Sequence, residues 1–537
     1  MLNENYPAQE NRNHSDNENI ALFRPQPVSV ETVILTVKSL KDSNAFGNDS
    51  FSSRFIKDAL FEIAFYVTII VNTSIVTGVN PFIWKYGQVA PYHKKGDVDD
   101  VSNYRPVTLL PVLSKVLEKI VAEQLMNYLE LNKLLSSSQH GFRKSLSTET
   151  ALMQVMEKLY HNMDNKKLSL ITLCDLSKAF DSVSHDILIN KCLQLKIDSF
   201  WFNDYLSNRT QSVRIGNHIS SAINMTFGVP QGSILGPILF LIYVNDMKDI
   251  IKECLFVQYA DDSQFIHTGE VSEIDDIIKR TEETLSNAKR YFLENGLMVN
   301  PKKTQFIFIG TRQIISQIPE NVTINFDNES ITPSKQVKNL GIYIDNELQF
   351  DIHINELCKK ATGTLLYINR MSDRFDKETR TQIVQTLVLS MINYCLKIWG
   401  TTNRTQLQKV QKLQNFAARV AVGGVRKYDH ITPTIRELQW LKIEQKCDYD
   451  ICIMVFKILR NKLPSWLITL RTVSEMHSRY TRQRNHLFFD RTNTNVGSRS
   501  LTKRGPFLWN TLPEQIKDTN SLTLFKDRLK KFFLEQQ

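Results

Sequence analysis

The sequence predicts an α+β fold over its middle part and a mainly helical structure over its last third. Short apolar and β-branched runs typical of strands mix with helical patterns up to about residue 350, without the regular strand–helix–strand repeat of a parallel sheet. Beyond residue 350, apolar residues recur mainly at helical spacing. The chain has 537 residues, 42% hydrophobic and 23% charged, so it can form several domains with hydrophobic cores. This composition excludes a wholly disordered or fibrous protein.

The N-terminal part has the pattern of a polar tail followed by helices. Residues 1–27 are rich in Asn, Glu and Gln, which predicts a disordered tail and does not resemble a signal peptide. Residues 30–79 predict a helix, a loop and a second helix. The apolar run Ala59–Val71 contains Glu62 and is shorter than a membrane span. We therefore expect residues 28–73 to form a helical extension, and we expect neither membrane association nor secretion.

The rest of the chain carries the mixed succession of elements that defines the fold class. In chain order we predict a strand-like segment over Phe82–Asn103, a helix over Leu110–Leu131, a strand over Leu168–Cys174, a helix over Ser233–Met247, two strands within Cys254–His267, a helix over Glu273–Leu293, short strands over Phe306–Ile309 and Gly341–Ile344, and a helix over Gln406–Val422. The last helix is followed by Gly423, a residue that favours helix termination.

Charge and cysteine content narrow the classes of partner and compartment. Residues 1–350 hold 34 Lys and Arg against 40 Asp and Glu, whereas residues 351–537 hold 32 against 16. A basic last third suggests a polyanionic partner such as nucleic acid, although a solvated basic surface would give the same composition. The seven cysteines include no C-x-x-C pair, which argues against a disulfide scaffold or a zinc ribbon and favours a reducing compartment.

Three carboxylates follow or join predicted strands. Asp175 comes directly after the strand Leu168–Cys174, and Asp261 and Asp262 lie where two predicted strands meet. Mg²⁺ prefers oxygen ligands, and phosphoryl transfer often uses two such ions held by clustered aspartates. An Asp-Asp pair is also common in hairpin turns, so by itself it leaves both readings open.

Three motifs in a fixed order give this pattern a specific meaning. Tyr259-Ala260-Asp261-Asp262 resembles the signature tetrapeptide of reverse transcriptases. Asp175-Leu176-Ser177-Lys178-Ala179-Phe180-Asp181 resembles their first catalytic-aspartate motif, and Gly228-Val229-Pro230-Gln231-Gly232-Ser233 resembles the motif that opens their template-contacting helix. Together they are similar to the enzymes of non-LTR (LINE-type, jockey-like) retrotransposons.

Further segments extend the resemblance from about residue 30 to the C-terminus. They are Lys94–Asp97 with Asn103–Pro106 in the fingers, Gln139–Arg143 in the block that follows, the lysine motif Asn300–Thr304, the primer-grip pair Leu340-Gly341, and Arg504–Pro513 in the tail. The resemblance implies a right-hand polymerase, with fingers and an antiparallel palm sheet over residues 74–344. It also implies a helical thumb over residues 345–440 and a basic C-terminal region over residues 441–537.

The resemblance also implies roles for single residues in catalysis. Asp175 and Asp261 would bind two Mg²⁺ ions, with Mn²⁺ as a possible substitute, and the Leu176 carbonyl is a possible further ligand. Asp262 would support the cluster or brace the turn. Lys303 would protonate the departing pyrophosphate.

A second group of residues would contact the nucleotide. Lys94 and Arg105 would bind the triphosphate, and Phe180 would reject a ribonucleotide by clashing with its 2′-hydroxyl. Gln231 and Gly232 would lie against the nascent base pair and the template. Two of the lysines have neighbours that could replace them, Lys95 in the fingers and Lys302 in the lysine motif.

The function expected from these features is RNA-directed DNA synthesis. The chain would use an RNA template, a DNA primer or target DNA, and dNTPs, in a ribonucleoprotein of the nucleus or cytoplasm. Too few residues precede the fingers for a nicking endonuclease, and the tail shows no zinc-knuckle pattern, so we expect that activity to be absent from this chain. The alternative is a catalytically dead or domesticated relic that binds RNA.

Overall fold

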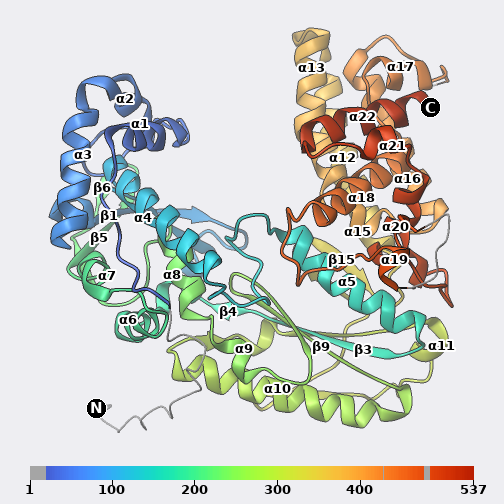
Figure 1. The fold of residues 1–537 in the computed structure, drawn as a ribbon, viewed down its shortest axis with the longest axis horizontal. Helices are drawn as coiled ribbons and strands as arrows, with labels where there is room; N and C mark the ends of the chain where they lie inside the picture. Colours follow the sequence, from blue (N-terminus) through green and yellow to red (C-terminus); the bar gives the residue numbers. More distant parts are fainter. Residues whose placement is uncertain (1–19, 427, 477–483) are drawn as a thin grey trace. The chain divides into compact units, whose positions relative to one another are not determined.

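A computed structural model of the chain describes residues 20–426, 428–476 and 484–537 (Figure 1). The chain divides into two compact units, and each is assembled from separate segments. The first unit comprises Met1–Phe142, Leu176–Ile250 and Lys289–Val299; the second comprises Arg143–Asp175, Ile251–Ala288 and Asn300–Gln537. Both units combine helices with sheets that contain antiparallel strand pairs, so the α+β prediction is confirmed at this level.

The first unit begins with the predicted helical extension. It contains α1 (Val30–Ser39), α2 (Ser53–Asp58) and α3 (Leu60–Thr77), which ends at Gly78 with a φ of 71°. The helix α3 extends beyond the apolar run predicted from the sequence. By length and composition alone it could cross a membrane, a property that it shares with core helices of soluble proteins.

Residues 20–27, which the sequence places in a disordered tail, are packed against the first unit. The Phe23 side chain is buried, its N–H donates to the Lys196 carbonyl over 2.8 Å, and its ring centroid lies 5.1 Å from that of Tyr128. Arg24 pairs with Asp198 at 2.5 Å. The prediction of disorder is therefore wrong for this stretch, and residues 1–19 lie outside the described residues.

The sheet of the first unit has the strand order β2-β1-β5-β6, and β7 also pairs with β5. β1 pairs antiparallel with β2 and parallel with β5. The remaining elements of the unit are helices and one short strand pair. The bounds are β1 (Tyr86–His93), β2 (Tyr104–Leu109), α4 (Val112–Leu131), β4 (Leu176–Ser177), α6 (His185–Gln194), α7 (Ser199–Leu206), β5 (Arg209–Ile215), β6 (His218–Ile219), β7 (Ile223–Met225), α8 (Gly236–Tyr243), α9 (Met247–Ile250) and β10 (Met298–Val299).

The sheet of the second unit is fully antiparallel, with the order β11-β3-β9-β8. The strands predicted in these parts of the sequence are confirmed. Two long helices accompany the sheet, and the last residues of one of them belong to the first unit. The bounds are α5 (Thr148–Asp164), β3 (Leu168–Cys174), β8 (Leu255–Tyr259), β9 (Asp262–Gly269), α10 (Ile274–Glu294) and β11 (Gln305–Ile309).

The helices α5 and α10 lie on opposite faces of this sheet (Figure 1). Asn162 of α5 donates a side-chain hydrogen bond to Thr268 of β9 over 2.9 Å. The next side chain toward the start of β9, His267, contacts the hydroxyl of Thr281 in α10 at 3.1 Å. Because successive side chains of a strand point to opposite faces, Asp262 at the start of β9 lies on the α5 face.

The remainder of the second unit is mainly helical, as predicted. A hairpin of β14 and β15 precedes the helices. The helix α16 ends as expected, with Gly423 at a φ of 73°. The bounds are β14 (Gln336–Asn339), β15 (Ile342–Asp345), α12 (Asp351–Arg370), α13 (Lys377–Val384), α14 (Ser390–Asn393), α15 (Leu396–Trp399), α16 (Arg404–Val422), α17 (Thr432–Glu437), α18 (Ile443–Leu459), α20 (Leu501–Thr511) and α22 (Leu522–Glu535).

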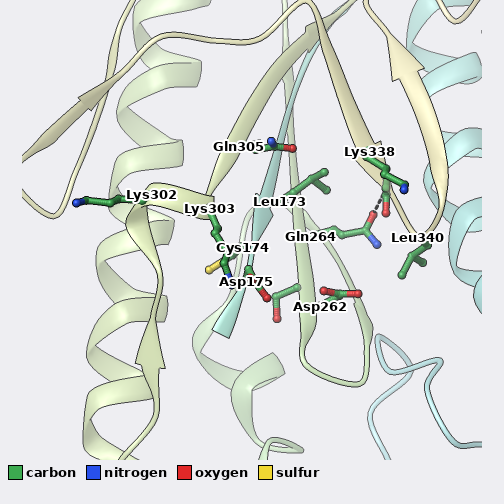
Figure 2. A pocket seen from close by; sticks show the side chains of 12 residues that line it. Leu173, Cys174, Asp175, Asp262, Gln264, Lys302, Lys303, Gln305, Lys338 and Leu340 are labelled. Carbon is green, nitrogen blue, oxygen red and sulfur yellow. Dashed lines mark hydrogen bonds and ion pairs between the residues drawn. The ribbon is translucent and has the colours of Figure 1, made fainter. Parts of the chain in front are cut away.

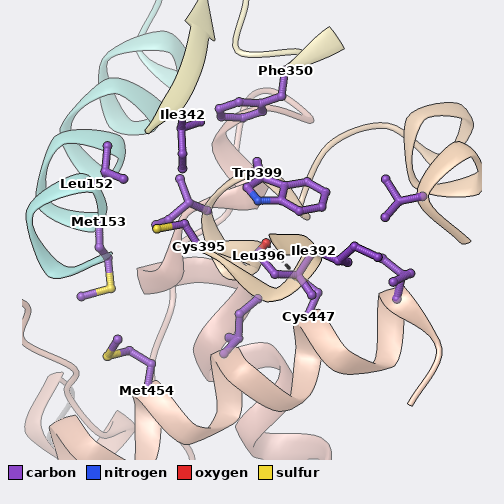
Figure 3. Close-up of a cluster of buried hydrophobic side chains, with 14 of the residues drawn as sticks. Leu152, Met153, Ile342, Phe350, Ile392, Cys395, Leu396, Trp399, Cys447 and Met454 are labelled. Atoms are coloured by element: carbon purple, nitrogen blue, oxygen red, sulfur yellow. Dashed lines mark hydrogen bonds between the residues drawn. The ribbon is translucent and has the colours of Figure 1, made fainter. Parts of the chain in front are cut away.

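One hydrophobic cluster connects the sheet helix α5 with these later helices. Figure 3 shows Leu152 of α5, Ile342 of β15 and Cys447 of α18 around Trp399, whose side chain is fully buried. The cluster continues to Phe525 in α22. The C-terminal region therefore shares its core with the sheet and does not form a separate core of its own.

Two acidic side chains of α5 also bind the C-terminal region. The Glu157 carboxylate accepts hydrogen bonds from the backbone N–H groups of Leu501 and Thr502, at the start of α20. The Asp164 carboxylate accepts one from the N–H of Thr494 over 2.8 Å. Acceptors at a helix N-terminus satisfy donors that have no partner within the helix. These contacts hold residues 494–502 against α5.

Candidate active site

A pocket of about 420 Å³ lies on the α5 face of the second unit's sheet (Figure 2). Strand pairing explains how residues from distant parts of the sequence meet there. β3 and β9 pair with Cys174 opposite Ser263, so Asp175, just beyond β3, adjoins Asp262 at the start of β9. The pocket is lined by Leu173, Cys174, Asp175, Asp262, Ser263, Gln264, Lys302, Lys303, Gln305, Lys338, Asn339 and Leu340.

The adjacent aspartates occupy a tight hairpin between β8 and β9. Tyr259 pairs with Asp262, so Ala260 and Asp261 form the two turn residues. Ala260 has a φ of 57°, a left-handed conformation that costs an L-residue about 1 kcal/mol. Asp261 is half-buried in the turn, whereas Asp262 opens the strand and faces the pocket. The Asp-Asp pair can therefore belong to a hairpin turn and to an acidic site at the same time.

The carboxylates repel one another. Neighbouring protein atoms that displace part of its solvent, and then the charges of Asp261 and Asp175, raise the pKa of Asp262 to about 6, although the residue as a whole remains exposed to solvent. Both aspartates act on the same side chain, so the three carboxylates share one local environment. Sites that concentrate negative charge in this way are candidates for binding a cation.

Lys303 contacts this acidic group. The Lys303 ammonium lies 3.1 Å from the Asp175 carboxylate. Figure 2 shows the neighbouring Lys302 pointing away from that carboxylate. Of the two lysines that the sequence left open, Lys303 is therefore the one in contact with the acidic group.

The donor set fits a hard divalent cation in its chemistry. Asp175, Asp261 and Asp262 offer carboxylate oxygens, the ligands that Mg²⁺ prefers, and Mg²⁺ commonly completes its shell with water and substrate phosphates. Within the described ranges, no group of three or more Asp, Glu, His or Cys side chains has the arrangement of a metal site. The mutual repulsion around Asp262 is nevertheless of the kind that a cation relieves.

The predicted primer-grip pair forms the turn of the β14–β15 hairpin. Asn339 pairs with Ile342, which leaves Leu340 and Gly341 as the two turn residues. Leu340 lines the same pocket as Asp175. Asn339 donates a side-chain hydrogen bond to Gln264 of β9 over 2.7 Å, a contact that was not predicted from the sequence.

A second group of predicted residues meets in the first unit. Phe180 stacks on Phe240 of α8, with ring centroids 4.5 Å apart, and its carbonyl accepts the N–H of Val229 over 2.9 Å. Asp181, beside Phe180, accepts a side-chain hydrogen bond from Gln231 over 2.8 Å. Burial raises the pKa of Asp181, and the bond from Gln231 opposes that shift. The structure thus brings Phe180 and Gln231 together.

The loop that carries Gln231 and Gly232 packs tightly against β2. The N–H of Thr108 donates to the Gln231 carbonyl over 2.7 Å. Gly232 has a φ of 136°, and a Cβ at this position would lie 2.4 Å from the Thr108 carbonyl oxygen. Only glycine fits this position without displacement. The Ser233 hydroxyl accepts a hydrogen bond from the N–H of Gly236, the first residue of α8, over 3.0 Å.

The remaining predicted residues belong to other elements of the first unit, and the charge of Lys94 opposes the rise in the pKa of Asp181, so this lysine lies within electrostatic range of the Phe180 and Gln231 group. Lys94 follows β1 and Arg105 lies in β2; both are exposed, and their neighbours His93 and Tyr104 pair across the two strands. Lys95 is also exposed, so burial does not decide between the two lysines. Leu176 has a buried side chain and pairs with Val299 of β10.

Sequence reasoning missed two polar side chains that lie close to predicted residues. Asp181 lies inside the recognised motif but received no role, although it contacts Gln231. Gln264 lies two residues after Asp262 and therefore on the same face of β9, a signal that the period of a strand could have given. Its partner Asn339 is 75 residues away and could not be identified from the pattern.

Comparisons with known proteins agree with the motifs. Residues 92–344 match the reverse transcriptase (RNA-dependent DNA polymerase) family. The probable RNA-directed DNA polymerase from transposon BS of Drosophila melanogaster is 26% identical over 435 residues, 78% of this chain and 47% of the relative. The enzymes of mobile element jockey are 25% identical in D. melanogaster and 27% in D. funebris, over 46% and 43% of their lengths and 78% and 72% of this chain. The chain thus spans less than half the length of these curated relatives.

Proposed function

We propose that this chain, which carries a reverse transcriptase domain over residues 92–344, is the RNA-directed DNA polymerase of a non-LTR retrotransposon. It copies an RNA template by adding dNTPs to the 3′-hydroxyl of a DNA primer or target strand. The observation that carries the proposal is the shared pocket of Asp175 and Asp262, next to Asp261, within the matched residues.

The acidic group has the donor chemistry for the metal ions of such a reaction. Asp175, Asp261 and Asp262, with the Leu176 carbonyl, would hold two Mg²⁺ or Mn²⁺ ions. When bound, such ions lower the pKa of an attacking hydroxyl and offset the charge of the triphosphate. The repulsion that raises the Asp262 pKa to about 6 supports this assignment, because a cation would remove it.

The chain's own residues then bind and orient the substrates. Lys303 is held by its ion pair with Asp175 and donates a proton to the pyrophosphate leaving group. Lys94 and Arg105 bind the triphosphate, and the exposure of both side chains leaves them accessible to it. Phe180 excludes ribonucleotides and is supported in this role by its stacking on Phe240.

The loop of the first unit and the hairpin of the second unit each have a proposed role. Gln231 and Gly232 lie against the nascent base pair and template, where the absence of a side chain at Gly232 permits close approach. Leu340 and Gly341 grip the primer.

The same proposal divides the chain into functional segments. Residues 28–73 are an N-terminal extension, residues 74–344 form fingers and palm, residues 345–440 form a thumb, and residues 441–537 form a basic C-terminal region. The excess of Lys and Arg beyond residue 350 supports contacts of the later segments with nucleic acid. The protein would act in a ribonucleoprotein of the nucleus or cytoplasm.

A homopolymer assay tests the proposed activity. The purified chain is incubated with poly(rA), oligo(dT), dTTP and Mg²⁺, together with Asp261→Asn and the matched variant Asp275→Asn, which changes an exposed aspartate of α10. We expect synthesis that depends on the template, is abolished in Asp261→Asn and is unchanged in Asp275→Asn. RNA binding without synthesis by the unsubstituted chain would instead support an inactive, RNA-binding relic.

A further inference from the structure

The turn Leu340-Gly341 places a leucine in a left-handed conformation. Leu340 has a φ of 43° and Gly341 a φ of 91°. Glycine adopts such values freely, but for leucine the left-handed region costs about 1–2 kcal/mol. A strained residue of this kind persists only where surrounding contacts determine its conformation. The turn should therefore be fixed by identifiable neighbours.

The first neighbour is Gln264 on the catalytic strand β9. Its side-chain carbonyl accepts the hydrogen bond from Asn339, the residue before the turn, and both side chains are buried, with exposed fractions of 1% and 3%. The Gln264 amide nitrogen has no hydrogen-bond partner, so the contact with Asn339 is the bond that orients this amide. Because Gln264 lies two residues after Asp262, the bond ties the turn to the strand that carries the carboxylate.

The second neighbour is Tyr394, which lies between α14 and α15. Its hydroxyl donates to the Leu340 carbonyl over 2.7 Å and lies 3.1 Å from the hydroxyl of Thr148 in α5. A Cβ placed on Gly341 would lie 3.2 Å from the Tyr394 ring. The ring therefore occupies the space beside the turn, and the hydroxyl fixes the carbonyl of the strained residue.

We propose that Gln264 and Tyr394 are positioning residues that together set the place of the Leu340-Gly341 turn relative to Asp262. The inference rests on the proposed function, in which this turn holds the primer end. Gln264 fixes the turn to the sheet, and Tyr394 fixes it to α5 and the helices that follow. Loss of either contact lets the turn move. The primer end then binds more weakly, and a smaller fraction of it is aligned with the carboxylates.

The test compares Tyr394→Phe, Gln264→Leu, the double variant and a control. Tyr394→Phe removes only the hydroxyl, and Gln264→Leu removes the acceptor for Asn339. Tyr449→Phe, which removes a hydroxyl from α18 outside the pocket, serves as the control. The Kd for a fluorescent RNA template with a recessed DNA primer is measured first. Extension kinetics are then measured with varied primer–template and with varied dNTP, and thermal midpoints report on folding.

We expect each single variant to raise the Kd and the KM for primer–template about 3- to 10-fold, the range for loss of one hydrogen bond. The KM for dTTP should change less than twofold. General destabilisation of the protein would not change the KM for primer–template while leaving the KM for dTTP unchanged. The double variant should lose less than the product of the single effects, because both contacts hold one turn. Tyr449→Phe should match the unsubstituted chain.

Unchanged primer–template Kd in both single variants, or an equal rise in the KM for dTTP, would overturn the inference. Failure of the proposed function gives a different result. If the unsubstituted chain extends no primer, the proposed polymerase activity fails. The Kd comparison then still decides whether Gln264 and Tyr394 position the turn that holds a primer–template.

Discussion

The two groups of predicted site residues are held in place by different kinds of interaction. The acidic group of the second unit depends on strand register, which sets Asp175 beside Asp262 while their charges repel. The loop group of the first unit depends on close backbone contact, with Gly232 packed against the Thr108 carbonyl. In the acidic group, a charge can be removed without moving the backbone. In the loop group, adding a single methyl group at Gly232 requires the backbone to move.

The largest effect should come from removing a charge in the acidic group. Asp175→Asn keeps the size of the side chain but loses the negative charge that faces Lys303 at 3.1 Å. If the site works by holding cations, primer extension should fall on the order of 10³-fold or more, with a thermal midpoint within a few degrees of the unsubstituted protein. Initial rates and thermal unfolding measure the two quantities. Residual activity within tenfold would remove Asp175 from the chemistry.

The next largest effect should come from the loop, and there activity and stability should fall together. In Gly232→Ala the added Cβ would lie 2.4 Å from the Thr108 carbonyl, at a φ of 136° that alanine rarely adopts. We expect a loss of about 1–3 kcal/mol in the free energy of unfolding, and extension reduced about 10- to 100-fold.

Gly216→Ala is the matched control for this prediction. Gly216 has a φ of 60°, in the left-handed region that L-residues adopt at a cost of about 1–2 kcal/mol, and a Cβ there meets no atom within 4 Å, so Gly216→Ala adds moderate backbone strain without a clash. Denaturant unfolding of the two variants separates these causes. Equal losses in both would show that strain, and not contact with Thr108, governs the loop.

The same difference explains how much the sequence could predict. Leu168–Cys174 and the strands around Asp261 follow from local apolar patterns, and the motifs assigned Asp175 and Gln231 without coordinates. The pairing of Gln264 with Asn339 depends on a register between segments 75 residues apart, which no local pattern contains.

Two further misses have local causes. The helix α5 was not predicted, although Ser147 and Thr150 form a capping box at its start. The strand β2 was not predicted because it contains Pro106 and few apolar residues, so its assignment depends on pairing with β1.

A smaller effect tests whether the loop group selects the sugar. Phe180→Val shortens a side chain that stacks on Phe240, while the backbone contact of residue 180 with Val229 remains. We expect the preference for dUTP over UTP on poly(rA) to fall about tenfold, an effect of the size that shape selection in a pocket supplies. Phe200→Val, at an exposed phenylalanine of α7, is the control. An unchanged ratio would leave Phe180 as a packing residue only.

The smallest effect concerns stability and returns to the acidic group. The folded state raises the pKa of Asp262 from 3.8 to about 6, so ionising this side chain costs more in the folded than in the unfolded chain. The contribution of the protonated Asp262 to the free energy of unfolding is therefore fully present below about pH 4. It is lost as the pH rises through 6. Asp262→Asn cannot ionise and escapes this loss. Without divalent metal at pH 7.5, we expect the variant to be more stable by about 1 kcal/mol, after allowance for solvent screening of an exposed side chain.

Adding Mg²⁺ should reverse this order, and the reversal distinguishes a cation site from a merely crowded hairpin. A ligand that binds only the folded state stabilises it, and Asp262→Asn replaces a charged carboxylate by a neutral amide that binds a cation more weakly. Thermal midpoints of both proteins are measured at pH 4 and 7.5, with and without 5 to 10 mM Mg²⁺ (about the range that weak carboxylate sites require). We expect Mg²⁺ to raise the thermal midpoint of the unsubstituted chain at pH 7.5 but not at pH 4. We expect no such rise for Asp262→Asn. Equal shifts of the thermal midpoint in both proteins would mean that Asp262 is repelled by its neighbours but does not bind a cation. The acidic group and the loop group would then differ only in the geometry that holds them.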